Sequence, residues 1–406
     1  MDYQSNPSKK PKSTVSAKLD SILVKGDFDR PLFVIIMLLL CFGSVMVFSA
    51  SYAYAYSSRD DSSFYIRKQL LYALIGVLAM WGISKIHYKV IQLFTPVIYG
   101  ISIALLVLVL VIGTSEDEAK RWMNLGFISF QPSEIAKFAL VLMLAWFAHK
   151  YRKRIMERDG TLATYTKSAV WSTVIPMLFV ILTCGLVVLE NHLSGTIILL
   201  CIGVSVIWAG GGKKSVYLIG LLAILLVVYI ILFQQDFLKE LLPAYQWKRI
   251  DMWLNPEAYD VQDDTWQTVQ GLIAVGSGGI FGRGIGNSLQ KHLFISQPQN
   301  DFIFAVLCEE LGLVGAAALI ILYMVFFIRC LQIARRAPDV FSTLTVIGIA
   351  SHVMIQALLN MMVVTSIIPN TGIALPFFSY GGSSLTFLMV EMGIVLSISR
   401  FSRIQK

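Results

Sequence analysis

The chain has 406 residues, of which 56% are hydrophobic and only 14% are charged, and its formal net charge is +8. A soluble domain carries about 25% charged residues, so this composition excludes an ordinary soluble protein and predicts a membrane protein. The positive charge does not indicate a nucleic-acid partner, because basic residues of membrane proteins gather in cytoplasmic loops. The five cysteines lie in or beside apolar runs without zinc-site spacing, which argues against a zinc site and a disulfide framework.

Apolar runs of about 17–25 residues are long enough to cross a bilayer. They predict an all-α, polytopic membrane protein with about ten transmembrane helices, near 31–54, 68–86, 91–113, 132–149, 169–189, 193–209, 214–233, 301–328, 340–368 and 384–400. Residues 1–30 are polar and basic and lack the apolar core of a signal peptide. We therefore expect a disordered tail followed by a single transmembrane domain over 31–400.

The charged residues of the loops orient these helices. Lys and Arg gather in the N-terminal tail and after the fourth, sixth, eighth and tenth helices, whereas 115–120 is acidic and 369–383 carries no charge. The positive-inside rule then places both termini, including the tail at 401–406, in the cytoplasm. It also makes 234–300 a long extracellular loop between helices 7 and 8, and long ordered loops tend to be functional.

Three acids lie in or beside the predicted eighth helix, in the stretch PQNDFIFAVLCEELG. Asp301 falls in its first turn, where a carboxylate is stabilised by the helix dipole whether or not it has a further role. Glu309 and Glu310 lie about 12–14 Å further along the helix axis. This position predicts that both lie near the middle of the membrane and make interhelical hydrogen bonds, and Glu391 is interpreted in the same way.

The start of the predicted fourth helix carries a charged pair. Pro132 suits a first helical position, and Glu134 suits the positive end of the helix dipole. Lys137 lies about one and a half turns into the membrane and needs an acidic partner or an anionic ligand. Glu134 and Lys137 share one face of the helix, so they form either a local ion pair or part of a site for a charged substrate.

The uncharged stretch IIPNTGIALPFFSYGGSSL joins the last two predicted spans on the outer side. A bland linker is the ordinary interpretation of such a loop. The neutral hydrogen-bonding side chains within it would, however, suit a sugar substrate; they are Ser379, Tyr380, Ser383 and Ser384.

Four blocks of the sequence, in order, resemble the signatures of a known family: QPSEIAKF, GSGGIFGRGIGNSLQK, NDFIFAVLCEELGLVG and TGIALPFFSYGGSSL. They are similar to those of the SEDS family, the bacterial shape, elongation, division and sporulation proteins typified by FtsW, RodA and SpoVE. The similarity runs from about 31 to 400 and is greatest to the FtsW/SpoVE branch. Ten spans with both ends inside the cell also match the fold that this resemblance implies.

The resemblance implies a peptidoglycan glycosyltransferase of the bacterial cytoplasmic membrane, acting in cell division or cell-shape maintenance. Such proteins join lipid II, an undecaprenyl-pyrophosphate-linked disaccharide pentapeptide, into β-1,4 glycan strands, and they work with a class B penicillin-binding protein, a transpeptidase. The catalytic aspartate of the family corresponds to Asp301, and its cavity glutamate and lysine correspond to Glu134 and Lys137. Asn300 and Asn370 depart mildly from the family blocks.

This activity agrees with the chemistry of the remaining polar residues. An acceptor hydroxyl must lose a proton as it attacks, and a carboxylate at the membrane boundary can serve as the general base. The leaving pyrophosphate needs cations, for which Arg121, Lys137, Arg249 and Arg283 are the candidates on the outer side. Gln267 is a further predicted substrate-binding residue. No cofactor or metal ligand set is predicted, and a requirement for a divalent cation stays open.

Two rival classes share some of these features. A lipid II flippase would place polar groups through the whole depth of the membrane, whereas the candidate groups here cluster towards the outer end. A non-catalytic scaffold of the cell-wall machinery would leave Lys137 and the uncharged outer loop unexplained.

Overall fold

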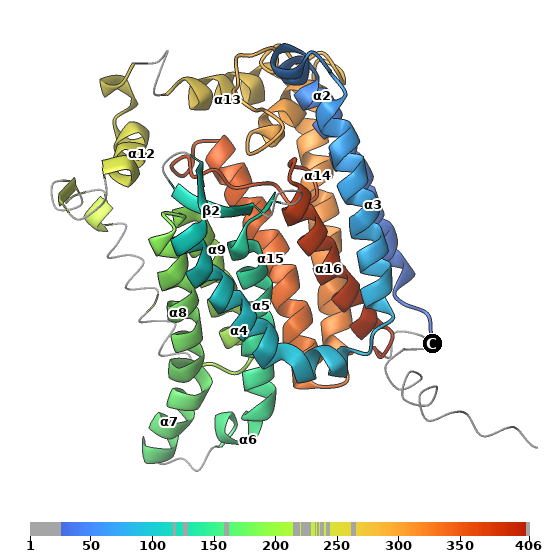
Figure 1. The fold of residues 1–406 in the computed structure, drawn as a ribbon, viewed down its shortest axis with the longest axis vertical. Helices are drawn as coiled ribbons and strands as arrows, with labels where there is room; N and C mark the ends of the chain where they lie inside the picture. The colour runs from blue at the N-terminus through green and yellow to red at the C-terminus, as the bar shows by residue number, and fades with distance from the viewer. Residues whose placement is uncertain are drawn as a thin grey trace, which may run out of the picture.

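A computed structural model of the chain describes residues 26–116, 119–124, 129–157, 162–213, 244–260 and 265–402, with a few isolated positions between 220 and 240. Its described part is a bundle of long helices that run roughly side by side (Figure 1). The expected basic tail at 1–30 and the expected seventh span at 214–233 lie largely outside the described residues.

The long helices of the bundle, in chain order, are α2 (Arg30–Arg59), α3 (Phe64–Ser84), α4 (Tyr88–Ile112), α5 (Pro132–Lys150), α8 (Ile175–Leu189), α9 (Leu193–Ala209), α14 (Ile303–Arg335), α15 (Val340–Val364) and α16 (Gly382–Ser399). The shorter elements are α6 (Arg152–Ile155), α7 (Leu162–Ala169), η1 (Val170–Val174), α12 (Ala244–Leu254), η2 (Pro256–Ala258) and α13 (Trp266–Ser277). Figure 1 places α13 and the strand β2 at one end of the bundle, called here the upper end, and α6 and α7 at the other.

Seven of the predicted spans are confirmed as helices long and apolar enough to cross a membrane. They include Thr164–Leu189, which joins α7, η1 and α8 into one continuous helix. The predicted fourth span is the helix α5, and the predicted sixth span is the shorter apolar helix α9. Local sequence explains where helices begin: Asp29 accepts a hydrogen bond from the Leu32 backbone at the start of α2, and Asp339 forms a capping box with Ser342 at the start of α15.

A small antiparallel sheet lies between α4 and α5, a feature that the all-helical prediction did not include. Its strands are β1 (Thr114–Glu116), β2 (Ala119–Asn124) and β3 (Ser129–Phe130), in the order β1-β2-β3. The sheet ends directly before α5, which begins at Pro132 as the sequence predicts.

The helix α14 breaks at Gly312, where the backbone takes non-helical angles with φ +65°. The part from Leu313 to Arg335 is about 34 Å long at 1.5 Å per residue, so it is long enough by itself to cross a hydrocarbon core of about 30 Å. Glu309 and Glu310 precede the break and therefore belong to a separate upper segment. The expectation of one straight helix is therefore wrong at Gly312, and the depth of the two glutamates in the membrane stays a prediction.

Glu309 and Glu310 fasten the loop that follows α13 to this upper segment of α14. Glu309 accepts hydrogen bonds from the Ser288 hydroxyl (2.5 Å) and the Leu289 amide (2.9 Å). Glu310 accepts from Lys291 Nζ (2.8 Å) and from Ser49 Oγ of α2 (2.7 Å). Both carboxylates are fully buried. The predicted interhelical bond is thus confirmed for Glu310, whereas Glu309 binds a loop.

The connection between α15 and α16, residues 365–381, enters the bundle and packs against α2. A Cβ added to Gly43 would overlap the backbone carbonyl of Phe377, so only glycine permits this close approach. The Phe377 and Phe378 side chains are fully buried there. This loop is therefore a fixed part of the core that can carry functional groups, and the interpretation of it as a bland linker fails.

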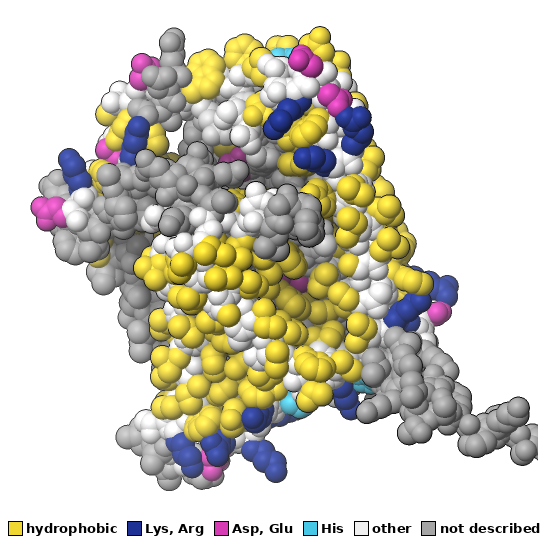
Figure 2. All heavy atoms as spheres, in the orientation of Figure 1, with side chains coloured by type: hydrophobic (Ala, Val, Ile, Leu, Met, Phe, Trp, Pro, Cys, Tyr) yellow, Lys and Arg dark blue, Asp and Glu magenta, His cyan; other side chains and the backbone are white. Residues whose placement is uncertain are grey.

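The outer surface of the bundle fits a lipid environment. Figure 2 shows apolar side chains covering the middle of this face, whereas Lys and Arg lie at both ends: beside α6 and α7 at the lower end, and together with Asp and Glu at the upper end. Large apolar residues such as Leu93 and Val111 are more than two-thirds exposed, at 73% and 71%. Such exposure is costly in water and is expected where lipid replaces water. The fold is that of a polytopic helical membrane protein.

Candidate functional site

Three polar residues along one face of α15 form the centre of the candidate site. His352, Gln356 and Asn360 are spaced four residues apart, so they lie along one face of the helix. All three are buried, and their side chains point towards α5, α16 and the 365–381 loop. Within an apolar helix such a stripe must find polar partners inside the protein.

Gln356 connects α5 to the 365–381 loop. Its Oε1 atom accepts a hydrogen bond from Lys137 Nζ (2.9 Å), and its Nε2 atom donates to the carbonyl of Ala374 (2.9 Å). Lys137 also forms an ion pair with Glu134 (2.9 Å), and its side chain is 4% exposed. The two interpretations of the Glu134–Lys137 pair are therefore compatible, because the pair is local and also belongs to a larger buried network.

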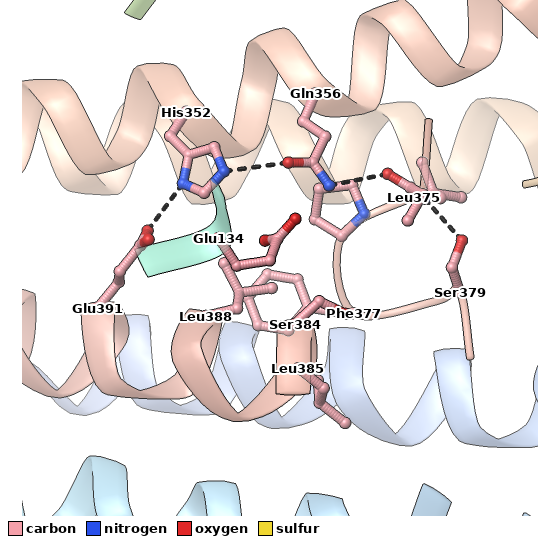
Figure 3. A pocket seen from close by; sticks show the side chains of 12 residues that line it. Glu134, His352, Gln356, Leu375, Phe377, Ser379, Ser384, Leu385, Leu388 and Glu391 are labelled. Carbon is pink, nitrogen blue, oxygen red and sulfur yellow. Dashed lines mark hydrogen bonds and ion pairs between the residues drawn. The ribbon is translucent and has the colours of Figure 1, made fainter. Parts of the chain in front are cut away.

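His352 extends this network to α16. Its Nε2 atom lies 3.0 Å from Gln356 Oε1, and its Nδ1 atom lies 2.9 Å from Glu391 Oε2 (Figure 3). Glu134, His352, Gln356 and Glu391 line one narrow cavity. His352 and Glu391 lie about halfway along their helices, so the network reaches from the upper end of α5 to the middle of the bundle.

The 365–381 loop also forms the wall beside Asp301. Gly372 takes a left-handed backbone angle, φ +64°, and a Cβ placed on it would lie 3.6 Å from Asp301 Oδ2. Asn360 joins the two chain segments that meet here, because its Nδ2 atom donates to the carbonyls of Asp301 (2.8 Å) and Ile373 (2.6 Å). Asp301 itself lies in the turn before α14, which begins at Ile303, and not in its first helical turn.

A second and larger cavity, about 1170 Å³ including space open to solvent, lies at the upper end between α12, α13 and the 365–381 loop. Its polar lining comprises Lys248, Arg249, Thr265, Gln267, Thr268, Ser366 and Asn370, beside the Trp253 ring. Arg249 donates from Nη1 to the carbonyl of Asn370 (3.0 Å). Asn370 lines this cavity, Gly372 lies beside Asp301, and Ala374 lines the narrow cavity, so one short loop connects Asp301 to both cavities.

The surroundings of Asp301 suit a group that exchanges protons. Burial raises the pKa of the Asp301 carboxyl above its ordinary value, and the Asp301 and Phe302 backbone amides and the Arg249 guanidinium oppose this rise. A general base is most effective when its pKa approaches the working pH. The electrostatic environment therefore moves Asp301 in the direction that base catalysis requires.

Arg121 lies in a separate polar group at the upper end, formed with the turn between α8 and α9. Its Nη2 atom donates to the carbonyl of Asn191 (2.7 Å). Burial raises the pKa of Glu190 to about 8, although Arg121 opposes the rise, and burial lowers the pKa of His192 to about 3. Among the described residues, neither carboxyl oxygen of Glu190 has a hydrogen-bond partner. His192 contacts Gln131 Nε2 (3.1 Å) just before α5.

The other predicted substrate residues are divided among several places. Ser379 and Ser384 line the narrow cavity, and Ser379 accepts a hydrogen bond from the Leu375 amide (2.6 Å). Tyr380 packs edge-on against Tyr65 at 4.9 Å, and the half-buried Ser383 lies in the first turn of α16.

Arg283 lies apart from these groups. Its Nη1 atom is 3.6 Å from Glu309, and it lines neither of the two cavities described above.

Sequence reasoning did not single out His352, Gln356, Asn360 or Glu190. For the first three a signal exists, since polar residues at a spacing of four within a predicted span mark one interior-facing stripe. Glu190 has no such signal, because an acid in a short loop between spans is ordinarily exposed. In the part of the chain that the structure describes, no three His, Cys, Asp or Glu side chains are grouped to hold a metal ion.

The fold and the site together define a class: a helical membrane protein with a buried charged network that leads to a carboxylate at one end. The family model described as "Cell cycle protein", for FtsW, RodA and SpoVE, matches residues 29–404. The chain belongs to this family, the SEDS family, and the resemblance seen in the four sequence blocks is confirmed.

Individual relatives agree with this family. The chain is 36% identical to stage V sporulation protein E of Bacillus subtilis (strain 168), over 92% of this chain and 98% of that one. It is 33% identical to the probable peptidoglycan glycosyltransferase FtsW of Trichlorobacter lovleyi, over 92% and 93% of the two chains.

Two solved structures share the fold. One is described as "Structural coordination of polymerization and crosslinking by a peptidoglycan synthase complex". It has a TM-score of 0.72 and 26% identity, and the match covers 93% of this chain and 99% of that one. The rod shape determining protein RodA of Thermus thermophilus has a TM-score of 0.66 and 26% identity, over 93% and 98% of the chains.

Proposed function

We propose that this protein is a peptidoglycan glycosyltransferase that joins lipid II into β-1,4 glycan strands at the outer face of the bacterial cytoplasmic membrane. In this proposal Asp301 removes the proton from the acceptor hydroxyl as that oxygen attacks the sugar carbon, and undecaprenyl pyrophosphate leaves. The relatives described as probable peptidoglycan glycosyltransferases support this activity. The strands would serve division or cell-shape maintenance.

The observation that carries the proposal is the position of Asp301. Asp301 lies beside Gly372, and Gly372 belongs to the 365–381 loop that links a large polar cavity to the buried Lys137 network. Burial also raises the pKa of Asp301. The larger cavity offers cations, amides and an aromatic face next to apolar residues such as Leu272. These are the groups that a pyrophosphate, a sugar ring and a lipid chain would each require.

The upper end of the bundle is the outer face in this proposal, and both termini are cytoplasmic. The helices α6 and α7 at the lower end carry Arg152, Lys153, Arg154 and Lys167 and no acid, which supports that orientation. The similarity to a chain of a peptidoglycan synthase complex supports a transpeptidase partner, a class B penicillin-binding protein. We therefore expect the active form to be a complex with such a partner.

The test replaces Asp301 by Asn in the complex with the cognate transpeptidase, with purified lipid II as substrate. Asn keeps the size of the side chain but cannot accept the proton, and loss of a general base costs about 10²–10⁴ in rate. Glu257→Gln is the matched control, because Glu257 is an exposed acid that lines neither cavity. A folded Asp301→Asn protein that polymerises lipid II within a few-fold of the wild type would reject Asp301 as the base.

A lipid II flippase is the second candidate, and one observation favours it. The charged network does not stop near the upper end, since it reaches His352 and Glu391 halfway down the bundle. Lipid II movement in vesicles that contain the Asp301→Asn protein separates the two functions. The enzyme is supported if the Asp301→Asn protein makes no glycan and the wild type transports no lipid II. The flippase is supported if the wild type transports lipid II and the Asp301→Asn protein still does so.

A further inference from the structure

The orientation of the Gln356 amide is fixed by its three neighbours. Its Nε2 group faces the carbonyl of Ala374, and its Oε1 atom faces the Lys137 ammonium. The reverse orientation would set two donors against each other at Lys137 and two acceptors against each other at Ala374. Gln356 Oε1 therefore accepts both of its hydrogen bonds, one from Lys137 and one from His352.

This orientation determines the protons on His352. Since Gln356 Oε1 can only accept, the Nε2 atom of His352, 3.0 Å away, must carry a hydrogen. The Nδ1 atom lies 2.9 Å from Glu391 Oε2, and a bare ring nitrogen facing a bare carboxylate would repel it. One proton must therefore lie between them, either on the ring as imidazolium beside carboxylate or on the carboxyl as an acid beside neutral imidazole.

Burial makes this shared proton important. The side chains of His352 and Glu391 are 5% and 2% exposed, at a depth where an uncompensated charge is expensive. In both arrangements the pair carries no net charge, as does the Glu134–Lys137 pair beside it. The buried network is thus neutral as a whole only while His352 and Glu391 hold that proton.

We propose that His352 and Glu391 are a proton-sharing pair that positions Gln356, and through Gln356 both the Lys137 ammonium and the loop wall beside Asp301. Held in this way, Gln356 fixes one hydrogen of Lys137 and anchors the Ala374 carbonyl, two residues from Gly372. Glu134 takes a second hydrogen of Lys137, which leaves the third for a ligand. The consequence for catalysis rests on the proposed function, and His352 and Glu391 are positioning residues in it.

The test compares Glu391→Gln with Glu391→Met in the complex with the transpeptidase. A Gln amide can donate to an unprotonated Nδ1 atom, so it keeps the bond to His352 without the shared proton, whereas Met of similar length cannot. We expect Glu391→Gln to retain kcat for lipid II within about threefold of wild type. We expect Glu391→Met to lose at least about tenfold in kcat with a smaller change in KM, because the Lys137 contact strengthens as the leaving group gains charge.

A second matched pair covers the case in which Glu391→Met does not fold. Gln at position 352 can donate to Gln356 Oε1, whereas Met cannot, so His352→Gln should exceed His352→Met in kcat by about fivefold or more. Equal kcat values for the Gln and Met variants at either position would overturn the positioning role.

Thermal unfolding separates this inference from the proposed function. Glu391→Gln should unfold within a few degrees of the wild type, and Glu391→Met should unfold clearly lower. If the wild type makes no glycan, the proposed function fails, while the order of unfolding temperatures still tests the hydrogen-bonded pair. If the wild type is active but both variants unfold at the same temperature, the pair is rejected and the proposed function stands.

Discussion

Single charged side chains at this site act through the partners that burial forces on them. Lys137 is buried and has Glu134 and Gln356 as partners, so its charge is neutralised and its ammonium group is held in one position. Asp301 has no comparable ion pair at hydrogen-bond distance among the described residues, and Arg249 acts on it only through its field. The two residues therefore suit different roles, a fixed cation for an anionic group and a base that gains and loses a proton.

We expect Lys137→Met to lower polymerisation of lipid II by about 10- to 150-fold, because a hydrogen bond from a charged group contributes about 1.5–3 kcal/mol. Initial rates of glycan synthesis with the transpeptidase present measure this loss. The double variant Glu134→Gln/Lys137→Met removes both charges and is the control. If it regains wild-type rates, Lys137 serves only to neutralise Glu134 and has no role towards substrate.

The acid side of the pH–rate profile should report Asp301. A general base works when it is deprotonated, so the rate falls as the pH drops through its pKa, which burial has raised. Arg249→Met removes a cation that opposes this rise, so the fall should move to higher pH. Arg249→Lys keeps the charge and should leave the profile nearer to that of the wild type.

The measurement is kcat/KM for lipid II across the acid range for the three proteins. A profile that stays in place in Arg249→Met would show that the titrating base is some other group than Asp301.

At the scale of elements, the upper segment of α14 is positioned by the loop after α13. Gly282 has φ +75°, and a Cβ on it would overlap the backbone of Glu310. Glu309 and Glu310 then bind side chains and amides of the same loop. Because Asp301 lies just before this segment, the contacts that hold the segment also help to set the position of the carboxylate.

Gly282→Ala should therefore lower both the unfolding temperature and the glycan synthesis rate. Its added methyl group meets a backbone that cannot move cheaply, and it also carries the strain of a left-handed angle, about 1–2 kcal/mol. Gly286→Ala is the matched control, since Gly286 has φ +88° but open space around its Cβ position. Equal unfolding temperatures for the two variants would mean that the close contact with α14 contributes nothing.

At the scale of the whole molecule, the charged network and Asp301 lie on a path from the middle of the bundle to its upper end. The apolar surface between the two ends is about as tall as a hydrocarbon core requires, as the length of α14 below Gly312 indicates. A substrate with a lipid chain and a polar head could then lie along the bundle with its head at the upper end. This arrangement depends on which end faces outwards.

Cysteine labelling in intact cells tests the orientation. A cysteine at the exposed residue Ser296 should react with a membrane-impermeant reagent, and one at the exposed residue Lys153 should not. Lys291 is unsuitable for this purpose, because it is buried with Glu310. Reaction at Lys153 without reaction at Ser296 would invert the proposed topology and remove Asp301 from the outer face.

The sequence by itself determined the class of protein, most of the spans and the family. Hydropathy and helix starts such as Pro132 depend on neighbouring residues, so they can be read along the chain. The Glu134–Lys137 pair was predictable for the same reason, because three residues along a helix fix a distance.

Only the tertiary structure decided which polar groups meet. Lys137 and Gln356 are 219 residues apart in the sequence, and Ser49 and Glu310 are 261 apart. Their contacts follow from how helices pack around close approaches such as that of Gly43 to Phe377, and no local pattern carries that information. The break in α14 at Gly312 was not predictable for a related reason. It lies where the loop after α13 packs closely against Gly312, whereas the sequence there is one apolar run that predicts a single helix.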